Sequence, residues 1–320
     1  MPAFGIAFCL LSAAGFGAMG IFGKLAYDEG ATVGTLLSVR FAWAAVLFWV
    51  VVALTGRLGA LRLVGRRDLL LALGLGAFGY AAQAGAYFAA LDRLDASLLS
   101  LLLYTFPVMV ALAAAALGRE RLTRRVVAAL AAACAGGVFV LGGAPSGALD
   151  PLGTALGLTA AVVYSAYILT SSGVSARLDP LLLSALVVTG AAFTLTVAGV
   201  ATGDLDPGAV SPGGYGWLGA IAVVSTVGAI TLFFAGLGRV GPTTASIVST
   251  FEPVTAIGLA AAVFGESLSA TQLGGAALVL GAVVVLGVGR RRAPAPAPTG
   301  SERLPDDAEH RALLDFAPAG

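Results

Sequence analysis

The stretch STFEPVTAIGLAAAVFGESLS, residues Ser249–Ser269, places a carboxylic acid, Glu252, directly before Pro253 inside a long apolar run. Hydrocarbon penalises both residues: a charge at the centre of a membrane helix costs about 2.5–3.5 kcal/mol on insertion scales, and a proline removes a backbone donor. The same frame occurs 146 residues earlier as SLLLYTFPVMVALAAAALGRERLT, residues Ser100–Thr123. The two stretches therefore indicate an internal repeat, and its apolar runs read as membrane helices.

Composition supports a membrane environment. The 320 residues are 58% hydrophobic and 11% charged, whereas soluble domains carry about 25% charged residues. So few charges could not cover a water-facing surface, and we expect an all-α polytopic membrane protein. The net charge of +1 gives no indication of nucleic-acid binding, and the single histidine, His310, lies near the C-terminus. We therefore expect no metal site, no cofactor and no histidine chemistry within the membrane.

Apolar runs of about 20 residues, the length that crosses a bilayer, predict ten transmembrane helices. Their approximate bounds are 3–23, 33–55, 69–91, 95–117, 125–143, 152–172, 180–202, 215–237, 241–264 and 270–289. Continuous runs favour helices, because the strands of a membrane barrel would alternate. The first run lacks a basic leader and a convincing cleavage site, so we interpret it as a retained helix.

The loops differ in basic charge on the two sides of the membrane. One set of alternate loops, together with Arg290, Arg291 and Arg292 directly after the last span, holds 13 Lys and Arg residues, and the other set holds only Lys24 and Arg93. The basic side of a membrane protein is normally cytoplasmic, so both termini are expected there. The segment 290–320 runs on into APAPAP and mixed charge, and we expect a disordered cytoplasmic tail.

The repeat divides the chain into two five-helix units, residues 3–143 and 152–289. A shift of 146 residues places Pro107 on Pro253 and Glu120 on Glu266. Because five is odd, the second unit should enter the membrane upside down relative to the first. The basic residues that follow the fourth span have no basic counterparts after the ninth, as this inverted arrangement requires. Inverted repeats around a central site are a recurrent transporter architecture.

Glu252 is the first candidate for a functional residue. It lies near the middle of its span, and its counterpart in the first repeat is Phe106, so the repeat itself does not need an acid there. Desolvation favours the neutral form of a carboxyl group. Glu252 could bind a substrate amine or carry a proton across the membrane. The alternative is a protonated acid that is hydrogen-bonded inside the bundle.

The two aligned prolines, Pro107 and Pro253, interrupt helical hydrogen bonding near Leu103 and Ser249. Carbonyl groups freed at membrane depth must be satisfied by protein or by cavity water. We therefore treat both prolines as candidates for a gate hinge, with a static kink as the alternative.

Two basic residues lie near the expected outer ends of spans. Arg40 could bind a carboxylate or a phosphate through its planar fork, but we favour the simpler interpretation that its side chain extends to the membrane surface. Lys24 is interpreted as a boundary charge beside Asp28 or Glu29.

The remaining candidates are polar and aromatic. Tyr80, Gln83 and Tyr87 have the spacing of one helix face, and Tyr164 and Tyr167 share another. Aromatic walls with few polar groups suit amphipathic small molecules, although each tyrosine could equally be a packing residue. The full set of candidate substrate-binding residues is Glu252, Gln83, Tyr80, Tyr87, Trp43, Tyr104, Tyr164, Tyr167, Thr226 and Arg40.

These features resemble the drug/metabolite transporter (DMT) superfamily, specifically its EamA-type repeat. The resemblance rests on a proline thirteen residues before an acid in each repeat, on the Gly/Ala-rich helix that follows, on the FEPV of the ninth span, and on Arg40 in LLSVRFAWA. It implies ten helices, a bacterial inner (plasma) membrane and a central cavity between the repeats. It also implies that the fifth and tenth helices pack at the periphery, where family members often form a homodimer.

Together, these observations favour a secondary transporter that moves small metabolites, such as amino acids or amphipathic compounds, out of the cell by alternating access. The chain has no Walker-type nucleotide motif, and its partners are expected to be a small-molecule substrate and the lipid bilayer. Proton coupling through Glu252 and facilitated diffusion both remain open. The alternatives are a facilitative carrier of sugar-phosphate or nucleotide-sugar solutes, an intramembrane enzyme, and a structural membrane partner.

Overall fold

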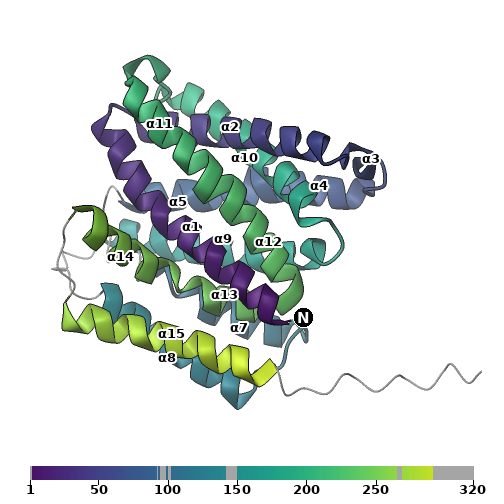
Figure 1. The fold of residues 1–320 in the computed structure, drawn as a ribbon, viewed down its shortest axis with the longest axis vertical. Coiled ribbons are helices and arrows are strands. Elements are labelled where there is room, and N and C mark those ends of the chain that lie inside the picture. The colour runs from purple at the N-terminus through teal and green to yellow at the C-terminus, as the bar shows by residue number, and fades with distance from the viewer. Residues whose placement is uncertain are drawn as a thin grey trace, which may run out of the picture.

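A computed structural model describes residues 2–91, 93, 99, 102–141, 150–264 and 269–290. Within these residues every regular element is a helix, and the helices form a single bundle (Figure 1). The predicted tail beyond Arg290 and the acid Glu266 lie outside the described residues.

The helices of the first repeat are α1 (Pro2–Asp28), α2 (Val33–Leu54), α4 (Arg66–Gly74), η1 (Leu75–Tyr80), α5 (Ala81–Leu91), α7 (Phe106–Ala116) and α8 (Arg124–Leu141). Those of the second are α9 (Pro151–Ser175), α10 (Pro180–Thr202), α11 (Pro212–Ala220), η3 (Ile221–Gly228), α12 (Ala229–Val240), α13 (Pro242–Ser249), α14 (Glu252–Phe264) and α15 (Ala270–Arg290). Two short helices, α3 (Leu58–Leu61) and η2 (Pro207–Ala209), lie in connections.

Seven of the described helices, some formed by consecutive elements, are long and apolar enough to cross a membrane. Two shorter apolar helices, Phe106–Ala116 and Ala270–Val285, occupy the places of the expected fourth and tenth spans. The fourth expected span, 95–117, lies partly outside the described residues. The fold is therefore an all-helical membrane bundle as predicted, and the count of ten spans stays a prediction.

Several helices of the second repeat begin where the sequence provides a cap and a proline. Pro180 opens α10, and the carboxylate of Asp179 before it accepts hydrogen bonds from the backbone N–H groups of Leu181 and Leu182. Asp150 accepts one from Gly153 at the start of α9 in the same way. Proline suits the first turn because its missing N–H would have no partner there. These short signals set the ends of the spans.

The backbone repeats with the period found in the sequence. The two π-helical segments η1 and η3 begin 146 residues apart, at Leu75 and Ile221, and so do α7 and α14, at Phe106 and Glu252. A turn precedes each of the latter pair. The internal repeat therefore includes irregular features of the main chain as well as the pattern of side chains.

Packing between the two repeats is reciprocal. In the first repeat α1 packs against α12 and α14, and in the second repeat its counterpart α9 packs against α5 and α7. Likewise α2 packs against η3, and its counterpart α10 packs against η1. Each of these contacts between the repeats is therefore matched by the equivalent contact with the repeats exchanged. Helices α8 and α15 pack against each other at one edge of the bundle (Figure 1).

Helices α2 and α10 run antiparallel and are joined at both ends. At one end the hydroxyl of Thr32 donates to the backbone oxygen of Asp204 at 2.6 Å, and at the other Arg57 pairs with Asp179 at 2.8 Å. Thr32 and Asp179 are equivalent N-caps, and Arg57 and Asp204 are equivalent residues after the helix ends, each pair 147 residues apart. One contact thus occurs twice, as an ion pair at one end and as a neutral hydrogen bond at the other.

Removing the two partners of this ion pair should have unequal effects. We expect Asp179→Ala to lower stability by about 1 kcal/mol, because it also removes the N-cap of α10. We expect Arg57→Gln to lower it by less, because the pair is 46% and 37% exposed and exposed ion pairs contribute little. Thermal unfolding of both variants in detergent checks this order; equal losses would mean that the ion pair, and not the cap, dominates.

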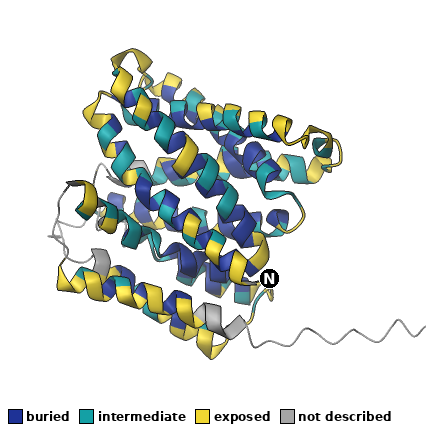
Figure 2. Ribbon diagram, viewed as in Figure 1, coloured by how far each residue is buried: buried dark blue, intermediate teal, exposed yellow. Residues whose placement is uncertain are grey.

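Many large hydrophobic side chains are exposed on the bundle, and the exposed positions lie on the outer sides of the helices in Figure 2. Large hydrophobic side chains such as Phe78 (77% exposed) and Phe193 (72% exposed) point away from the core. Soluble proteins rarely expose wide apolar patches, whereas lipid is a suitable solvent for them. The described surface is therefore that of a multi-pass membrane protein.

Glycine allows the closest helix approach in the bundle. A Cβ atom on Gly76 of η1 would lie 1.8 Å from the carbonyl oxygen of Val187 in α10, and one on Gly190 would lie 2.2 Å from that of Leu73. Small residues are the usual means of close packing between membrane helices. These two glycines bring α10 against η1, which forms part of the cavity wall.

Candidate functional site

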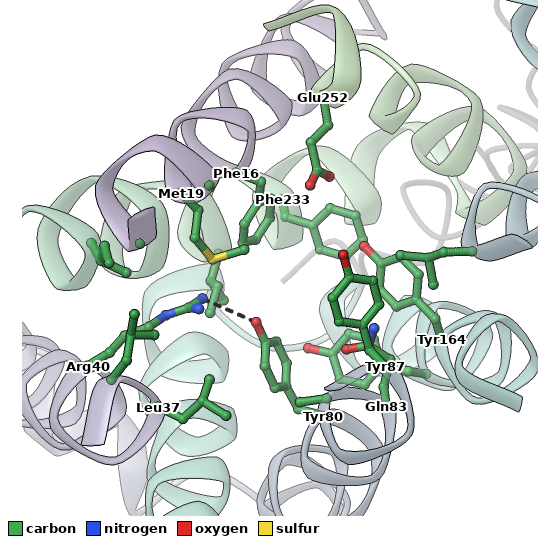
Figure 3. Close-up of a pocket in the computed structure, with 18 of the residues that line it drawn as sticks. Phe16, Met19, Leu37, Arg40, Tyr80, Gln83, Tyr87, Tyr164, Phe233 and Glu252 are labelled. Atoms are coloured by element: carbon green, nitrogen blue, oxygen red, sulfur yellow. Dashed lines mark hydrogen bonds between the residues drawn. The ribbon is translucent and has the colours of Figure 1, made fainter. Parts of the chain in front are cut away.

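A cavity of about 400 Å³ lies among α1, α2, η1, α5, α9, η3, α12 and α14 (Figure 3). Both repeats contribute to its wall, and most of the lining side chains are apolar or aromatic. Ligand sites commonly enclose about 300–1,000 Å³ and combine an apolar wall with a few polar groups. The cavity therefore has the size and chemistry of a site for a small molecule.

Glu252 is the first residue of α14, and its side chain points into the cavity (Figure 3). Its carboxyl group interacts with Tyr104 and Tyr164. The start of a helix carries unpaired N–H groups and partial positive charge, which favour a carboxylate. Gly17 allows α1 and α14 to approach each other closely here, because a Cβ atom on it would lie 2.7 Å from the carbonyl oxygen of Glu252.

A turn interrupts the helix before Glu252, and another interrupts it at the equivalent place in the first repeat. Pro107 and Pro253 each lie in the first turn of a new helix, so both aligned spans are interrupted rather than merely kinked. The hydroxyl groups of Thr105 and Thr250 donate to Leu102 and Ile247 carbonyl oxygens, each at 2.6 Å. Pro107 is buried, and Pro253 lines a second cavity of about 170 Å³. A hinge role for the two prolines remains a hypothesis.

Arg40 lies inside the protein, and the interpretation that its side chain extends to the membrane surface is wrong. Its side chain is 3% exposed and lines the cavity. Its Nε donates to the hydroxyl of Thr226 at 2.8 Å, and its Nη2 donates to the hydroxyl of Tyr80 at 3.3 Å. The guanidinium also lies 4.7 Å from the centre of the Phe41 ring. The hydrogen bonds to η1 and η3 hold the Arg40 side chain inward. The sequence alone did not show that these segments lie beside Arg40.

The two partners of Arg40 are repeat equivalents. Tyr80 in η1 and Thr226 in η3 are 146 residues apart, and both lie in π-helical segments. Thr226 also donates to the carbonyl oxygen of Ile221, five residues earlier. π-helical turns are rare and frequently occur at functional sites. Here they bring one hydroxyl from each repeat to the same guanidinium.

An aromatic cluster forms much of the wall. The ring centres of Tyr80 and Tyr167 are 6.2 Å apart, those of Tyr164 and Phe106 are 4.7 Å apart, and Tyr167 continues to Phe234 at 6.4 Å. Aromatic rings provide a large apolar surface with specific edge-to-face geometry. The cluster suits the apolar part of a ligand.

The structure brings together most of the residues singled out in the sequence. The cavity is lined by Glu252, Gln83, Tyr80, Tyr87, Tyr104, Tyr164, Tyr167 and Arg40. Thr226 lies behind Arg40, where it is fully buried and contacts the guanidinium. Trp43 lies outside the cavity: it is 38% exposed, and its ring stacks on that of Tyr215 at 5.9 Å. Its face of α2 could not be assigned from the sequence, because the apolar side chains of α2 are spread around the whole helix.

Helix α1 also contributes to the cavity, which was not predicted from the sequence. Phe16, Met19, Gly23 and Tyr27 line the cavity from one face of this helix, and Lys24 joins them. Their spacing of three to four residues is that of a single helix face, so a signal was present. Lys24 had been interpreted as a boundary charge and lies at the cavity wall.

The described part of the chain contains no cluster of side chains that could bind a metal ion. No group of three or more His, Cys, Asp or Glu residues there is close enough to hold a metal ion. Cys9 and Cys134 do not form a disulfide bond.

An all-helical membrane bundle with an internal repeat and a central cavity is typical of secondary transporters. The EamA-like transporter family matches residues 3–142 and 151–288. The chain therefore belongs to the EamA-like transporter family and is a membrane transporter. Membership of this family implies a small-molecule substrate and a lipid environment.

The chain is similar to two named relatives. It is 28% identical over 281 residues to the uncharacterized transporter YcbK of Bacillus subtilis (strain 168), with 84% of this chain and 88% of the relative covered. It is 29% identical over 285 residues to an uncharacterized transporter of Archaeoglobus fulgidus, with 88% and 96% covered.

A solved structure titled "Crystal structure of protein" has the same fold. It superposes with a TM-score of 0.78 at 19% identity, covering 91% of this chain and 99% of its own.

Proposed function

We propose that this chain is a secondary transporter that exports small metabolites, such as amino acids or related amphipathic compounds, by alternating access without ATP. The observation that carries this proposal is the central cavity of about 400 Å³, which both repeats line and which contains one acid among aromatic side chains. Such a wall suits a molecule that is part apolar and part charged.

The two repeats are proposed to be inverted in the membrane. The antiparallel course of α2 and α10, which are repeat equivalents, supports this arrangement, and so does the reciprocal packing of the other helices. An odd number of spans in each repeat would produce it. Rocking one repeat against the other could then expose the cavity to each side in turn.

Glu252 is proposed to receive a cargo amine or a proton. Among the described residues that line the cavity, Glu252 is the only acid. The breaks before α7 and α14 are proposed hinges, because both adjoin the cavity and neither is a continuous helix. The pH dependence of flux distinguishes proton coupling through Glu252 from facilitated diffusion.

The chain is proposed to lie in the bacterial inner membrane with both termini in the cytoplasm. The basic loops support this orientation. The mutual packing of α8 and α15 at one edge leaves their outer faces for lipid or for a second copy in a homodimer. The two repeats are proposed as structural units at 3–143 and 152–289.

Flux into liposomes is the direct test. The purified full-length protein, reconstituted with amino acids and amphipathic cations as probes, should show solute-driven counterflow that empty liposomes lack. Turnover of a compound without flux would point to an enzyme. Preferred flux of sugar phosphates would favour the alternative carrier, although the described residues that line the cavity include only Arg40 and Lys24 as cations.

Topology can be tested separately. Single cysteines introduced at Glu120 and Glu266, in a background without Cys9 and Cys134, should be labelled from opposite sides of the membrane. Labelling of both from one side would end the inverted-repeat proposal.

A further inference from the structure

The guanidinium of Arg40 has hydrogen-bond donors to spare. An arginine side chain carries five N–H donors, and the hydrogen bonds that the described residues give it use Nε and Nη2. Both of its partners are neutral hydroxyl groups. Arg57 and Arg177 form ion pairs with Asp179 and Asp68, whereas no acid among the described residues forms an ion pair with Arg40.

A buried cation without an anion is costly. Membrane helices keep arginine at depth where it faces a cavity, a counter-charge or backbone oxygens. Arg40 is 3% exposed, and its head group points towards the centre of the cavity (Figure 3). An anion that enters the cavity would supply the missing counter-charge.

The second charged group of the site lies opposite. In Figure 3, Arg40 and Glu252 project from different sides of the cavity, with the aromatic side chains around the space between them. A cation and an acid that face one space match a cargo with both charges. A dianionic phosphate ester would bring excess negative charge beside Glu252.

We propose that Arg40 binds the carboxylate of a zwitterionic cargo, with Glu252 as the partner of the cargo's ammonium group. This inference rests on the proposed transport function and specifies its substrate class. Tyr80 and Thr226 are positioning residues, because they hold the guanidinium in the orientation in which its remaining fork faces the cavity. Only arginine offers this planar, two-pronged match to a carboxylate.

Matched pairs of probes test the carboxylate directly. Binding of phenylalanine and phenylalaninamide, and of leucine and leucinamide, would be measured on the purified full-length protein in nanodiscs. The wild type should bind each acid roughly tenfold to hundredfold more tightly than its amide, as charged hydrogen bonds allow. Arg40→Gln should remove this preference while binding of the amides changes little. Arg40→Lys should retain part of it, because the charge remains without the fork.

Two further variants separate the site from general structure. Thr226→Val should weaken binding of the acids only, and Arg93→Gln, at an exposed arginine outside the cavity, should leave the preference intact. Equal losses for acids and amides in Arg40→Gln would show a merely structural arginine. Loss of the preference in Lys24→Gln instead would assign the carboxylate to Lys24. Either result, or tighter binding of amides than of acids, overturns the inference.

The failure of this inference differs from that of the transport function. If none of the carboxylated probes binds but liposomes still show flux of another solute, the zwitterion assignment is wrong and the transporter stands. If no solute shows flux, the proposed function itself fails.

Discussion

Replacing Glu252 by glutamine is expected to lower the flux of amine-bearing cargo by roughly tenfold to hundredfold, because a hydrogen bond to a charged group contributes about 1.5–3 kcal/mol. Glutamine keeps nearly the same shape at the start of α14 and can still reach Tyr104. The loss would therefore reflect charge and proton exchange rather than packing. Counterflow in liposomes at several pH values is the measurement.

The pH dependence of that flux distinguishes the two roles of the acid. If Glu252 carries the proton, the glutamine variant should show residual flux that no longer varies with pH. If Glu252 only binds an amine, the variant should lose affinity while counterflow of neutral amphipathic probes persists. Tyr104→Phe is the matched control, since it removes a neighbouring hydroxyl and leaves the carboxyl. Flux that keeps its full size and pH dependence in Glu252→Gln would remove this acid from the mechanism.

Replacing Gly76 by alanine is expected to disrupt the fold more than any other single methyl group described here. The new Cβ atom would lie 1.8 Å from the Val187 carbonyl oxygen and 2.8 Å from the Ala191 nitrogen, both in the backbone of α10. Neither atom can move without displacing the helix. Overpacking typically costs about 1–3 kcal/mol, and we expect a loss at the upper end of this range or beyond. Thermal unfolding and the yield of monodisperse protein check it.

The same substitution at Gly85 provides the control. Gly85 lies in the same span, and a Cβ atom on it would meet nothing within 4 Å. Alanine is a better helix former than glycine by about 0.5–1 kcal/mol, so Gly85→Ala should be neutral or stabilising. A similar loss at both positions would mean that the close approach of η1 and α10 does not limit stability.

The repeat made much of the fold predictable. A shift of 146 residues, found from Pro107, Pro253 and the acids that follow them, also relates the starts of η1 and η3 and of α7 and α14. Duplication preserves backbone geometry even where side chains differ, as at Phe106 and Glu252. The aromatic face of Tyr80 and Tyr87 was also predictable, because a charge-poor helix shows its cavity side through its few polar groups.

Other parts of the site left no readable signal. The π-helical turns at η1 and η3 have no sequence pattern that the helical period reveals, so the capture of Arg40 by Tyr80 and Thr226 could not be foreseen. The apolar side chains of α2 are spread around the whole helix, so the sequence did not show that Trp43 lies outside the cavity that Arg40 lines. Which way such a helix turns is decided by its neighbours in the other repeat.

The crossed packing of the repeats also constrains the order in which the protein can assemble. Helix α1 is made first, but its main neighbours, α12 and α14, are among the last parts of the chain to be made. Until then the face of α1 that packs against α12 and α14 lacks its native partners. Neither repeat could form the cavity by itself, because both line it. The cavity can therefore be completed only after α14, near the end of the chain, has been synthesised.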